Sequence, residues 1–308
     1  KIIAELILLL TIVSMVGGII FYSYELYMHG KERQYIAWFS AGGFVLLTIP
    51  ISIRSIILHL WHWDMPYVQK YVVRILWMVP IYSVESWLSL RFRRFSIQIE
   101  ALRQSYEAYV IYSFLYFLIS TLGDEPKLIN ILKEKPSSRG EHPWPVNKCL
   151  SPWVMGYDFL HNCKIGVLQY VLIENLLAFV IALLQGFHVY GEGGFRWDRG
   201  YLYVCLISSI SQTWALYCMG IFYYGTWEEL HPWRPVSKFV CVKMVVFFTW
   251  WQSFFISFGT DFGLIVARPG ENNWTGVEIA KGIQDYLVCI EMLFFSIAFY
   301  YAFSYKDF

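Results

Sequence analysis

Two acidic residues lie inside long apolar stretches of the sequence, between residues 74 and 120. Glu85 stands in RILWMVPIYSVESWLSL, and Glu107 stands at the start of YEAYVIYSFLYFLIS. A carboxylate in a helix of bilayer length is costly, so it normally faces the interior of a helix bundle or a water-filled cavity. We therefore expect this pair to serve a substrate, an ion or a structural partner inside a membrane.

Polar and aromatic side chains recur three or four residues apart in two of the apolar runs, which places each set on one face of a helix, and in a third run Gln284 and Glu291 lie two turns apart on one face with Asp285 adjacent. The sets are Tyr82, Glu85, Ser86 and Ser89; then Lys243, Phe247, Trp250 and Phe254, with Gln252 on a neighbouring face; then Gln284, Asp285 and Glu291. Aromatic rings beside sparse polar groups suit an amphipathic ligand with a ring system and one polar end. The alternative is ordinary bundle packing, which is the simpler explanation for Trp250 and Phe254. The candidate substrate-binding residues are Tyr82, Glu85, Ser89, Glu107, Lys243, Trp250, Gln252, Gln284, Asp285 and Glu291.

The composition is that of a polytopic membrane protein. Hydrophobic residues make up 57% of the chain and aromatic residues 20%, and the mean hydropathy is +0.46. Only 15% of the residues are charged, against roughly 25% in soluble domains. The formal net charge of +1 does not imply nucleic acid as a partner. The six cysteines have no paired spacing, so neither a disulfide framework nor a zinc site is expected.

Eight apolar runs are long enough to cross a bilayer at roughly 20 residues per helix. They cover residues 2–22, 36–60, 67–90, 105–122, 166–188, 201–224, 238–264 and 283–305. We expect an all-α membrane bundle in one domain, residues 1–308, with a seven-span core over residues 36–305. Residues 2–22 are expected to form an extra N-terminal span. A signal sequence or signal anchor is the alternative, although this run is longer than a typical signal core.

Three features interrupt the apolar runs. Pro50 and Pro80 each lack a backbone N–H, so each is expected to kink its span. The basic segment RFRRF and the following SIQIEALRQS predict a short amphipathic link along a headgroup surface. Residues 123–165 contain proline, tryptophan and mixed charges, which predict an ordered, membrane-apposed loop.

Long blocks of the chain resemble the transmembrane protein 184 family, from about residue 36 onward. The blocks are PIYSVESWLSL, YEAYVIYSFLYFL, KIGVLQYVLIENL, SQTWALYCM, KFVCVKMVVFFTWWQ and GIQDYLVCIEMLFFSIAFYYAFSYK. That family is related to the alpha subunit of the organic solute transporter, which exports bile acids and steroid sulfates. The resemblance implies a cytoplasmic long loop and a small single-span partner. The related subunit has consecutive cysteines in this loop, whereas here only Cys149 stands at the matching place, as a candidate for acylation.

Asn273 begins a glycosylation sequon, Asn-Trp-Thr, between the last two predicted spans. A glycan there would place this connection outside and residues 123–165 inside, as the resemblance also implies. Lysine and arginine are divided equally between the two sides, so the positive-inside rule does not decide the orientation.

With the long loop inside, the charged residues of the spans separate by depth, counted at about 1.5 Å per residue from each helix end. Acids gather outside and bases inside: Glu85, Glu107, Asp261 and Asp285 lie in the outer part, Arg54, Arg74 and Lys243 in the inner part beside Glu174, and Glu291 near the middle. A positive inner half would draw an organic anion from the cytoplasm, so we hypothesise an export bias. The alternative is structural: Arg54, Arg74 and Glu174 take part in ion pairs between helices, for example Arg74 with Glu174 or Lys243 with Glu291, and other side chains snorkel to the interface.

We expect no enzymatic activity, no cofactor and no metal site. His59 and His62 are the only close histidine pair, and no histidine in the later spans completes a zinc site. A phosphate-binding loop followed by Lys-Ser or Lys-Thr is absent from the sequence, so no nucleotide drives the protein.

Two functions of different classes remain. The first is facilitative or gradient-driven transport of amphipathic organic anions or lipid-like solutes, steroid-like or bile-acid-like, with membrane lipids and a single-span partner or a second copy as partners. The second is a seven-span receptor or trafficking scaffold through which nothing crosses. The expected location is the plasma membrane or an endomembrane such as the vacuole or endosome.

Overall fold

The structure is a computed structural model that describes residues 17–18, 20–21, 23–25, 33–144, 146–148, 150–191, 197–261 and 276–308. These residues are helical or irregular and contain no strand, as the expected all-α class requires. Most of the predicted N-terminal span 2–22, the acylation candidate Cys149 and the sequon residue Asn273 lie outside the described residues.

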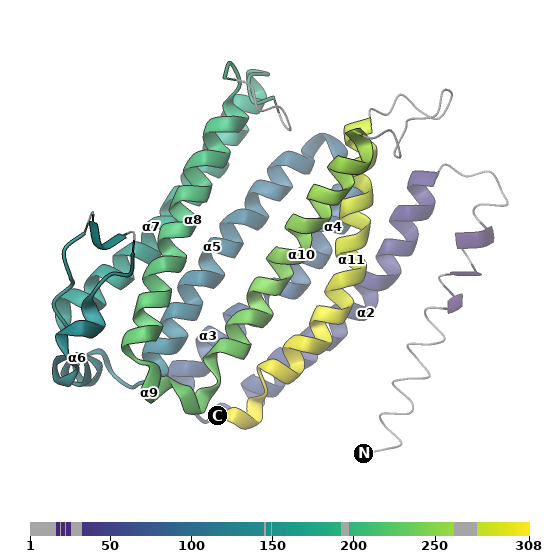
Figure 1. The fold of residues 1–308 in the computed structure, drawn as a ribbon. Helices are drawn as coiled ribbons and strands as arrows, with labels where there is room; N and C mark the ends of the chain where they lie inside the picture. Colours follow the sequence, from purple (N-terminus) through teal and green to yellow (C-terminus); the bar gives the residue numbers. More distant parts are fainter. Residues whose placement is uncertain are drawn as a thin grey trace. The chain divides into compact units, whose positions relative to one another are not determined.

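Long helices account for most of the described chain (Figure 1). They are α2 Arg33–Trp61, α5 Ser96–Thr121, α7 Tyr157–Gly186, α8 Gly200–Gly225, α10 Pro235–Asp261 and α11 Gly276–Ala302. Among the described residues, four segments are long and apolar enough to cross a membrane: Tyr35–Trp61, Tyr157–Gly186, Gly200–Gly225 and Glu278–Asp307. They match the spans predicted at 36–60, 166–188, 201–224 and 283–305.

The span predicted over residues 67–90 is not one helix. It consists of α3 Pro66–Leu76 and α4 Met78–Arg91, which are separated at Trp77. Pro80 lies in the first turn of α4 and has no N–H to bond the carbonyl of Leu76, so the hydrogen-bond ladder is interrupted there. Pro50, in contrast, lies inside the uninterrupted helix α2.

Two predicted connections are more helical than expected. The link after the third span contains only the short helix η1 Arg93–Phe95 before α5 begins at Ser96, so SIQIEALRQS is the first part of α5. The long loop contains α6 Glu125–Glu134 and the short helices η2 Ser137–Gly140 and η3 Val146–Lys148. It ends early, because α7 begins at Tyr157.

The chain forms two compact units. Unit 1 comprises residues 1–62, 76–99 and 240–306, and therefore holds α2, α4, α11 and most of α10. In unit 1, α11 packs against both α2 and α4, and α2 packs against α4 (Figure 1). Its core includes Ala41, Val45, Leu90 and Cys289. Helices from both ends of the sequence therefore build this unit.

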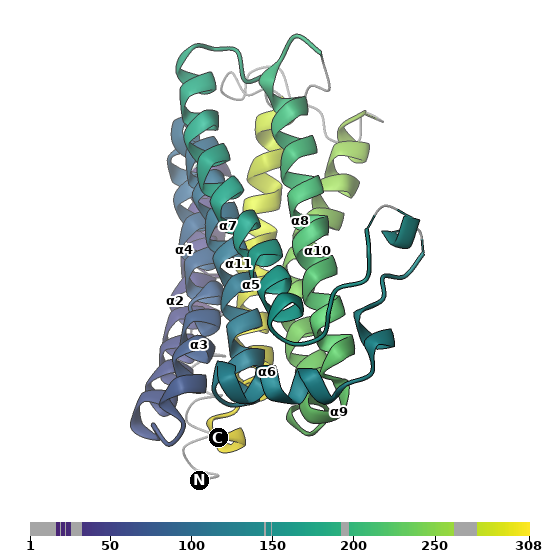
Figure 2. The ribbon, with the colours of Figure 1, turned by 90° about the vertical axis from the view of Figure 1, so that its left-hand side faces the viewer.

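Unit 2 comprises residues 63–75, 100–239 and 307–308. Its most extensive contact joins α7 to α8, which lie side by side in Figure 2, while α6 runs crosswise to them. Gly166 of α7 lies so close to α8 that a Cβ atom there would stand 2.2 Å from Cys218 Sγ. The absence of a side chain at Gly166 thus permits the close approach of the two helices.

Candidate functional site: a buried carboxylate track

The polar stripe of α4 faces the interior of unit 1. Tyr82, Glu85, Ser86 and Ser89 are all buried, and none is more than 8% exposed. Their spacing of three and four residues puts them on one side of α4, the helix that packs against α2 and α11. The structure therefore confirms that this predicted stripe points inward.

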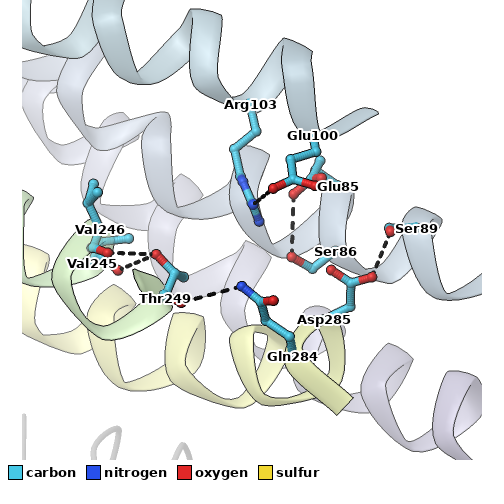
Figure 3. A network of polar contacts seen from close by, with 10 residues as sticks. All are labelled: Glu85, Ser86, Ser89, Glu100, Arg103, Val245, Val246, Thr249, Gln284 and Asp285. Atoms are coloured by element: carbon cyan, nitrogen blue, oxygen red, sulfur yellow. Dashed lines mark hydrogen bonds and ion pairs between the residues drawn. The ribbon is translucent and has the colours of Figure 1, made fainter. Parts of the chain in front are cut away.

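A carboxylate of helix α11 contacts the polar stripe of α4. Ser89 Oγ donates to Asp285 Oδ2 at 2.6 Å, and both side chains are buried (Figure 3). One turn away, Ser86 Oγ lies 3.4 Å from Glu85 Oε2. Two carboxylates from different helices are thus held beside serine hydroxyls in the interior of the unit.

The opposite side of the α11 stripe contacts α10. Gln284 Nε2 donates to the carbonyl oxygen of Thr249 at 3.3 Å (Figure 3). Gln252 Nε2 of α10 donates to Glu291 Oε1 of α11. Gln284 and Glu291 therefore share the side of α11 that meets α10, as their seven-residue spacing predicts, while Asp285 meets α4.

We call Glu85, Asp285 and Glu291 the carboxylate track. Among the described residues, Oε2 of Glu291 and Oε1 of Gln252 are buried without a hydrogen-bond partner. A buried polar atom without a partner costs about 1–3 kcal/mol. A proton carried by Glu291 or a ligand hydroxyl would donate to these oxygens, and a bound cation would be coordinated by them, so the track has unused capacity for binding.

Arg93 stands outside the spans, in the short helix η1 that follows α4. Burial lowers the pKa of its guanidinium to about 10, while the carboxylates of Glu278 and Asp285 act in the opposite direction. Arg93 is therefore protonated at neutral pH. It provides a positive charge near the end of the track that Asp285 occupies.

Unit 2 holds a second group of buried polar contacts. Gln212 Nε2 of α8 donates to Glu107 Oε1 of α5 at 3.0 Å. Ser208 Oγ of α8 donates to Glu174 of α7, a residue that is only 2% exposed. Both acids that the sequence placed in these spans are therefore buried and hydrogen bonded to neutral side chains of α8.

Sequence reasoning missed two partners in this second group. Ser208 was not selected, although it shares a helical face with Ser211 and Gln212 at a spacing of three and four residues. Gln169 of α7 exchanges two hydrogen bonds with Ser211, at 2.8 and 2.9 Å. The spacing of Ser208 was a usable signal, whereas nothing in the local sequence distinguishes Gln169.

The predicted pairing of Arg74 with Glu174 is wrong for the residues that the structure describes. The guanidinium of Arg74 lies over two tyrosine rings, with its carbon 5.2 Å from the centre of Tyr71 and 5.7 Å from that of Tyr109. Tyr71 lies one turn before Arg74 on α3, so the two side chains meet in a cation–π contact on the same helix. The predicted partner Glu174 lies on a different helix, α7. Arg54, the third candidate, is exposed.

The basic and aromatic stripe of α10 is only partly turned inward. Lys243 is half-buried, but Phe247 is 51% exposed and packs against the rings of Phe248 and Trp251. The side chain of Trp250 is outside the described part of the chain. Glu291 takes Gln252 as its partner instead of the predicted Lys243. Of the α10 residues that the sequence selected, Gln252 is thus the one whose side chain contacts the carboxylate track.

The histidine pair has a structural role at the end of α2. His59 is buried, and its Nε2 lies 2.9 Å from the carbonyl oxygen of Phe303. His62 Nδ1 lies 3.1 Å from the carbonyl oxygen of Leu58. Within the described ranges, no three His, Cys, Asp or Glu side chains are grouped to hold a metal ion.

The sequence is similar to that of known proteins over most of its length. The sequence model described as "Organic solute transporter Ostalpha" matches residues 37–308. Protein LAZ1 homolog 1 of Arabidopsis thaliana is 35% identical over 88% of this chain and 58% of its own length. Protein LAZ1, from the same plant, is 33% identical over 93% of the chain and 61% of its own length. Protein LAZ1 homolog 2 is 34% identical over 85% of the chain and 66% of its own length.

The chain spans about 60% of the length of these relatives. No solved structure matches it significantly.

Proposed function

Because the chain belongs to the organic solute transporter Ostalpha family, we propose that it moves amphipathic organic anions or lipid-like solutes across a membrane. Steroid-like and bile-acid-like solutes are the substrates we favour. The movement is facilitative or driven by a gradient, because the sequence contains no nucleotide-binding loop.

The observation that carries this proposal is the carboxylate track. Three acids lie in the helices of one unit, and the contacts described above join two of them to a serine hydroxyl and a glutamine amide. Ionisable residues inside membrane helices are rare and commonly mark a substrate or ion pathway. Hydrogen bonds to neutral groups also exchange more easily than tight ion pairs, so a solute or proton can replace them during a transport cycle.

The proposed topology has a seven-span core, with α3 and α4 together counted as one interrupted span, and an extra span at residues 2–22. The long loop is cytoplasmic, with Cys149 as its acylation site, and Asn273 lies on the opposite side. Arg54, Arg74 and Lys243 then lie toward the cytoplasm and favour the entry of anions from that side. A small single-span protein or a second copy is the proposed partner, in the plasma membrane or an endomembrane.

Uptake into proteoliposomes tests the proposal. The purified chain is reconstituted, and uptake of a labelled steroid sulfate and a labelled bile acid is measured for the unchanged chain, Glu85→Gln and Glu107→Gln. We expect saturable uptake that falls about tenfold or more in at least one variant, since one lost hydrogen bond to a charged group is worth that much. Glu134→Gln, in the exposed last turn of α6, is the matched control and should transport normally.

Absence of uptake of either solute, with or without a co-purified single-span partner, would overturn the transport proposal. It would favour the second candidate, a receptor or trafficking scaffold. One observation supports that candidate: Lys135 and Arg139 of the long loop form ion pairs with Glu228 of α9. A loop held in one shape in this way presents a defined surface to a cytoplasmic partner.

A further inference from the structure

Two buried oxygen atoms of unit 1 lack a hydrogen-bond donor, and they belong to two side chains that are already in contact. Gln252 of α10 donates from Nε2 to Oε1 of Glu291 on α11. The remaining oxygen of each group, Oε1 of Gln252 and Oε2 of Glu291, is buried without a partner among the described residues. We call Gln252 and Glu291 the acid–amide pair.

A single proton on Glu291 satisfies both oxygen atoms. An ionised carboxyl group only accepts hydrogen bonds, whereas a protonated one has an O–H that donates. With the proton on Oε2 of Glu291, this oxygen donates to Oε1 of Gln252, and the two planar groups share two hydrogen bonds. Turning the amide of Gln252 over does not remove the shortage in the ionised pair, because neither carboxylate oxygen has a hydrogen to donate.

The surroundings of the acid–amide pair are apolar. Phe248 of α10 packs against Phe295 of α11, with ring centres 6.0 Å apart. These two rings lie one helical turn from Gln252 and from Glu291, respectively. Val288, one turn before Glu291, is fully buried. An ionised carboxyl group is costly in such surroundings, and an acid inside a membrane helix commonly serves as a proton carrier.

In the part of the chain that the structure describes, Glu291 takes its hydrogen bond from Gln252 and makes no ion pair. The acids and bases that are buried or half-buried on α11 and on the helices around it are His59, Glu85, Lys238, Lys243, Lys281 and Asp285. The tyrosine and cysteine side chains of these helices are uncharged at neutral pH. A base on a neighbouring helix therefore does not neutralise Glu291 by direct contact, whereas a proton does.

A proton fits the two oxygen atoms better than a metal cation or a ligand hydroxyl. Hard cations such as calcium and magnesium take about six or more oxygen ligands. Within the described ranges, no three His, Cys, Asp or Glu side chains are grouped to hold a metal ion. A ligand hydroxyl has one hydrogen and would satisfy only one of the two oxygens.

We propose that the acid–amide pair is a proton-binding site, and that the proton held there is the ion coupled to solute movement. A proton from the aqueous phase forms an O–H bond at Oε2 of Glu291. Its release returns the carboxylate and leaves a single hydrogen bond in the pair, so occupancy changes how strongly α10 and α11 are joined. The coupling rests on the proposed transport, whereas proton binding does not.

Infrared difference spectroscopy of the full chain in phosphatidylcholine vesicles tests proton binding. The carboxylic acid C=O band of the unchanged chain at pH 7 is compared with that of Glu291→Gln. We expect Glu291→Gln to lose one deuterium-sensitive acid band and to stay folded, because an amide at residue 291 still makes two hydrogen bonds with Gln252. The exchanged pair, Gln252→Glu with Glu291→Gln, keeps one acid and one amide and should regain the band.

Two further variants separate the site from its surroundings. Glu278→Gln changes an exposed acid of the same helix and should keep the band. Gln252→Met removes the amide and should move the band to the higher frequency of an acid carbonyl without a hydrogen bond. Thermal unfolding of each variant shows whether its fold persists.

Solute uptake under an imposed pH gradient tests the coupling. Uptake of a labelled steroid sulfate into proteoliposomes is measured with and without the gradient, at equal membrane potential. We expect the gradient to change uptake severalfold in the unchanged chain and in the exchanged pair, and to have no effect in Glu291→Gln. A sodium gradient should change uptake in none of them.

The proton site is overturned if Glu291→Gln keeps every acid band of the unchanged chain, because another group would then hold the proton. A folded exchanged pair without the band would also overturn it. Uptake that responds to sodium and not to the pH gradient would overturn the coupling. A band from Glu291 without any uptake would refute the proposed transport and leave the proton site standing, and uptake without this band would do the reverse.

Discussion

At the scale of single residues, Ser89 and Asp285 show how a buried acid is held in this bundle. The hydroxyl of Ser89 on α4 donates to the carboxylate of Asp285 on α11 at 2.6 Å, in a region where both side chains are buried. Water cannot replace a lost donor there without opening the packed interface. The hydroxyl therefore contributes to stability as well as to the position of the acid.

We predict that Ser89→Ala lowers the free energy of unfolding by about 1 kcal/mol, the usual size of such a bond in a membrane bundle. The measurement is reversible unfolding in detergent for Ser89→Ala, Asp285→Asn and the double variant. A coupling energy of about 1 kcal/mol is expected in this cycle. Ser209→Ala, at an exposed position of α8, should leave stability unchanged. Fully additive effects of the two changes would contradict the prediction.

At the scale of elements, the contact between α7 and α8 depends on a small residue. A Cβ atom at Gly166 would stand 2.2 Å from Cys218 Sγ and 3.3 Å from Trp214 Nε1. Cys218 is fully buried, so its side chain cannot turn out into solvent to make room. The two helices can approach this closely only because residue 166 is glycine.

We predict that Gly166→Ala destabilises the protein by about 1–3 kcal/mol, the usual cost of overpacking a core. The double variant Gly166→Ala with Cys218→Ala should recover part of this loss, because it removes the nearest atom. Gly220→Ala is the control, since no atom lies within 4 Å of its added Cβ. Thermal unfolding of the four chains is the measurement. Equal loss in both single glycine variants would show that helix packing is not the cause.

The long loop is a second element whose position depends on a few contacts. Lys135 Nζ pairs with Glu228 and, at 2.7 Å, with Glu229. Arg139 Nη1 donates to the carbonyl oxygen of Tyr224 at 3.1 Å. The hydrogen bond to Glu228 raises the pKa of Lys135, and the same bond lowers the pKa of Glu228. Charged forms of both residues therefore hold the loop against α8 and α9.

We predict that Lys135→Met increases hydrogen exchange of residues 136–156 severalfold at pH 7, whereas Lys133→Met, on an exposed position of α6, does not. Because the pKa of Glu228 is lowered in the folded protein, Glu228 stabilises the loop fully at any pH above its pKa in the unfolded chain. This stabilisation disappears as the pH falls through the pKa of Glu228 in the folded protein. Because the pKa of Lys135 is raised in the folded protein, Lys135 stabilises the loop fully below about pH 10, and this stabilisation is lost at higher pH. The unchanged chain should therefore protect this loop between about pH 5 and 10. Equal exchange in both lysine variants would show that the ion pairs do not hold the loop.

At the scale of the whole molecule, the two compact units differ in whether their residues are continuous in the sequence. Unit 2 is mostly continuous, over residues 100–239, whereas unit 1 combines helices from both ends of the chain. Helix α11, near the C-terminal end, provides the surface on which α2 and α4 pack. Unit 1, with the carboxylate track, can therefore form only after α11 has been made.

The proposed orientation gives a prediction at this scale. In a eukaryotic host, Asn273→Gln should remove a glycosidase-sensitive mass shift, because the proposed orientation puts the sequon outside and residues 123–165 inside. A cysteine introduced at the exposed position Asn147 should react with a membrane-impermeant maleimide only after the membrane is opened. Labelling of this cysteine in intact cells would reverse the orientation, and with it the assignment of Arg54, Arg74 and Lys243 to the cytoplasmic half.

The sequence by itself determined the class and the local pattern of this protein. Its apolar runs predict the long helices to within a few residues at α2 and α8, because bilayer length and helical periodicity are local properties. The three-residue and four-residue spacing also predicts which side of α4 is buried, and the seven-residue spacing predicts that Gln284 and Glu291 share one side of α11. Long matching blocks indicated the family before any contact was known.

Only the tertiary structure decided which side chains meet. Arg74 contacts Tyr71 and Tyr109 instead of Glu174, since a tyrosine one turn away and another on α5 surround its guanidinium. Of the two helix breaks predicted at Pro50 and Pro80, the structure interrupts a helix only beside Pro80. The physical reason is that periodicity fixes the buried side of each helix, whereas partners depend on the separation and relative shift of helices that are distant in sequence.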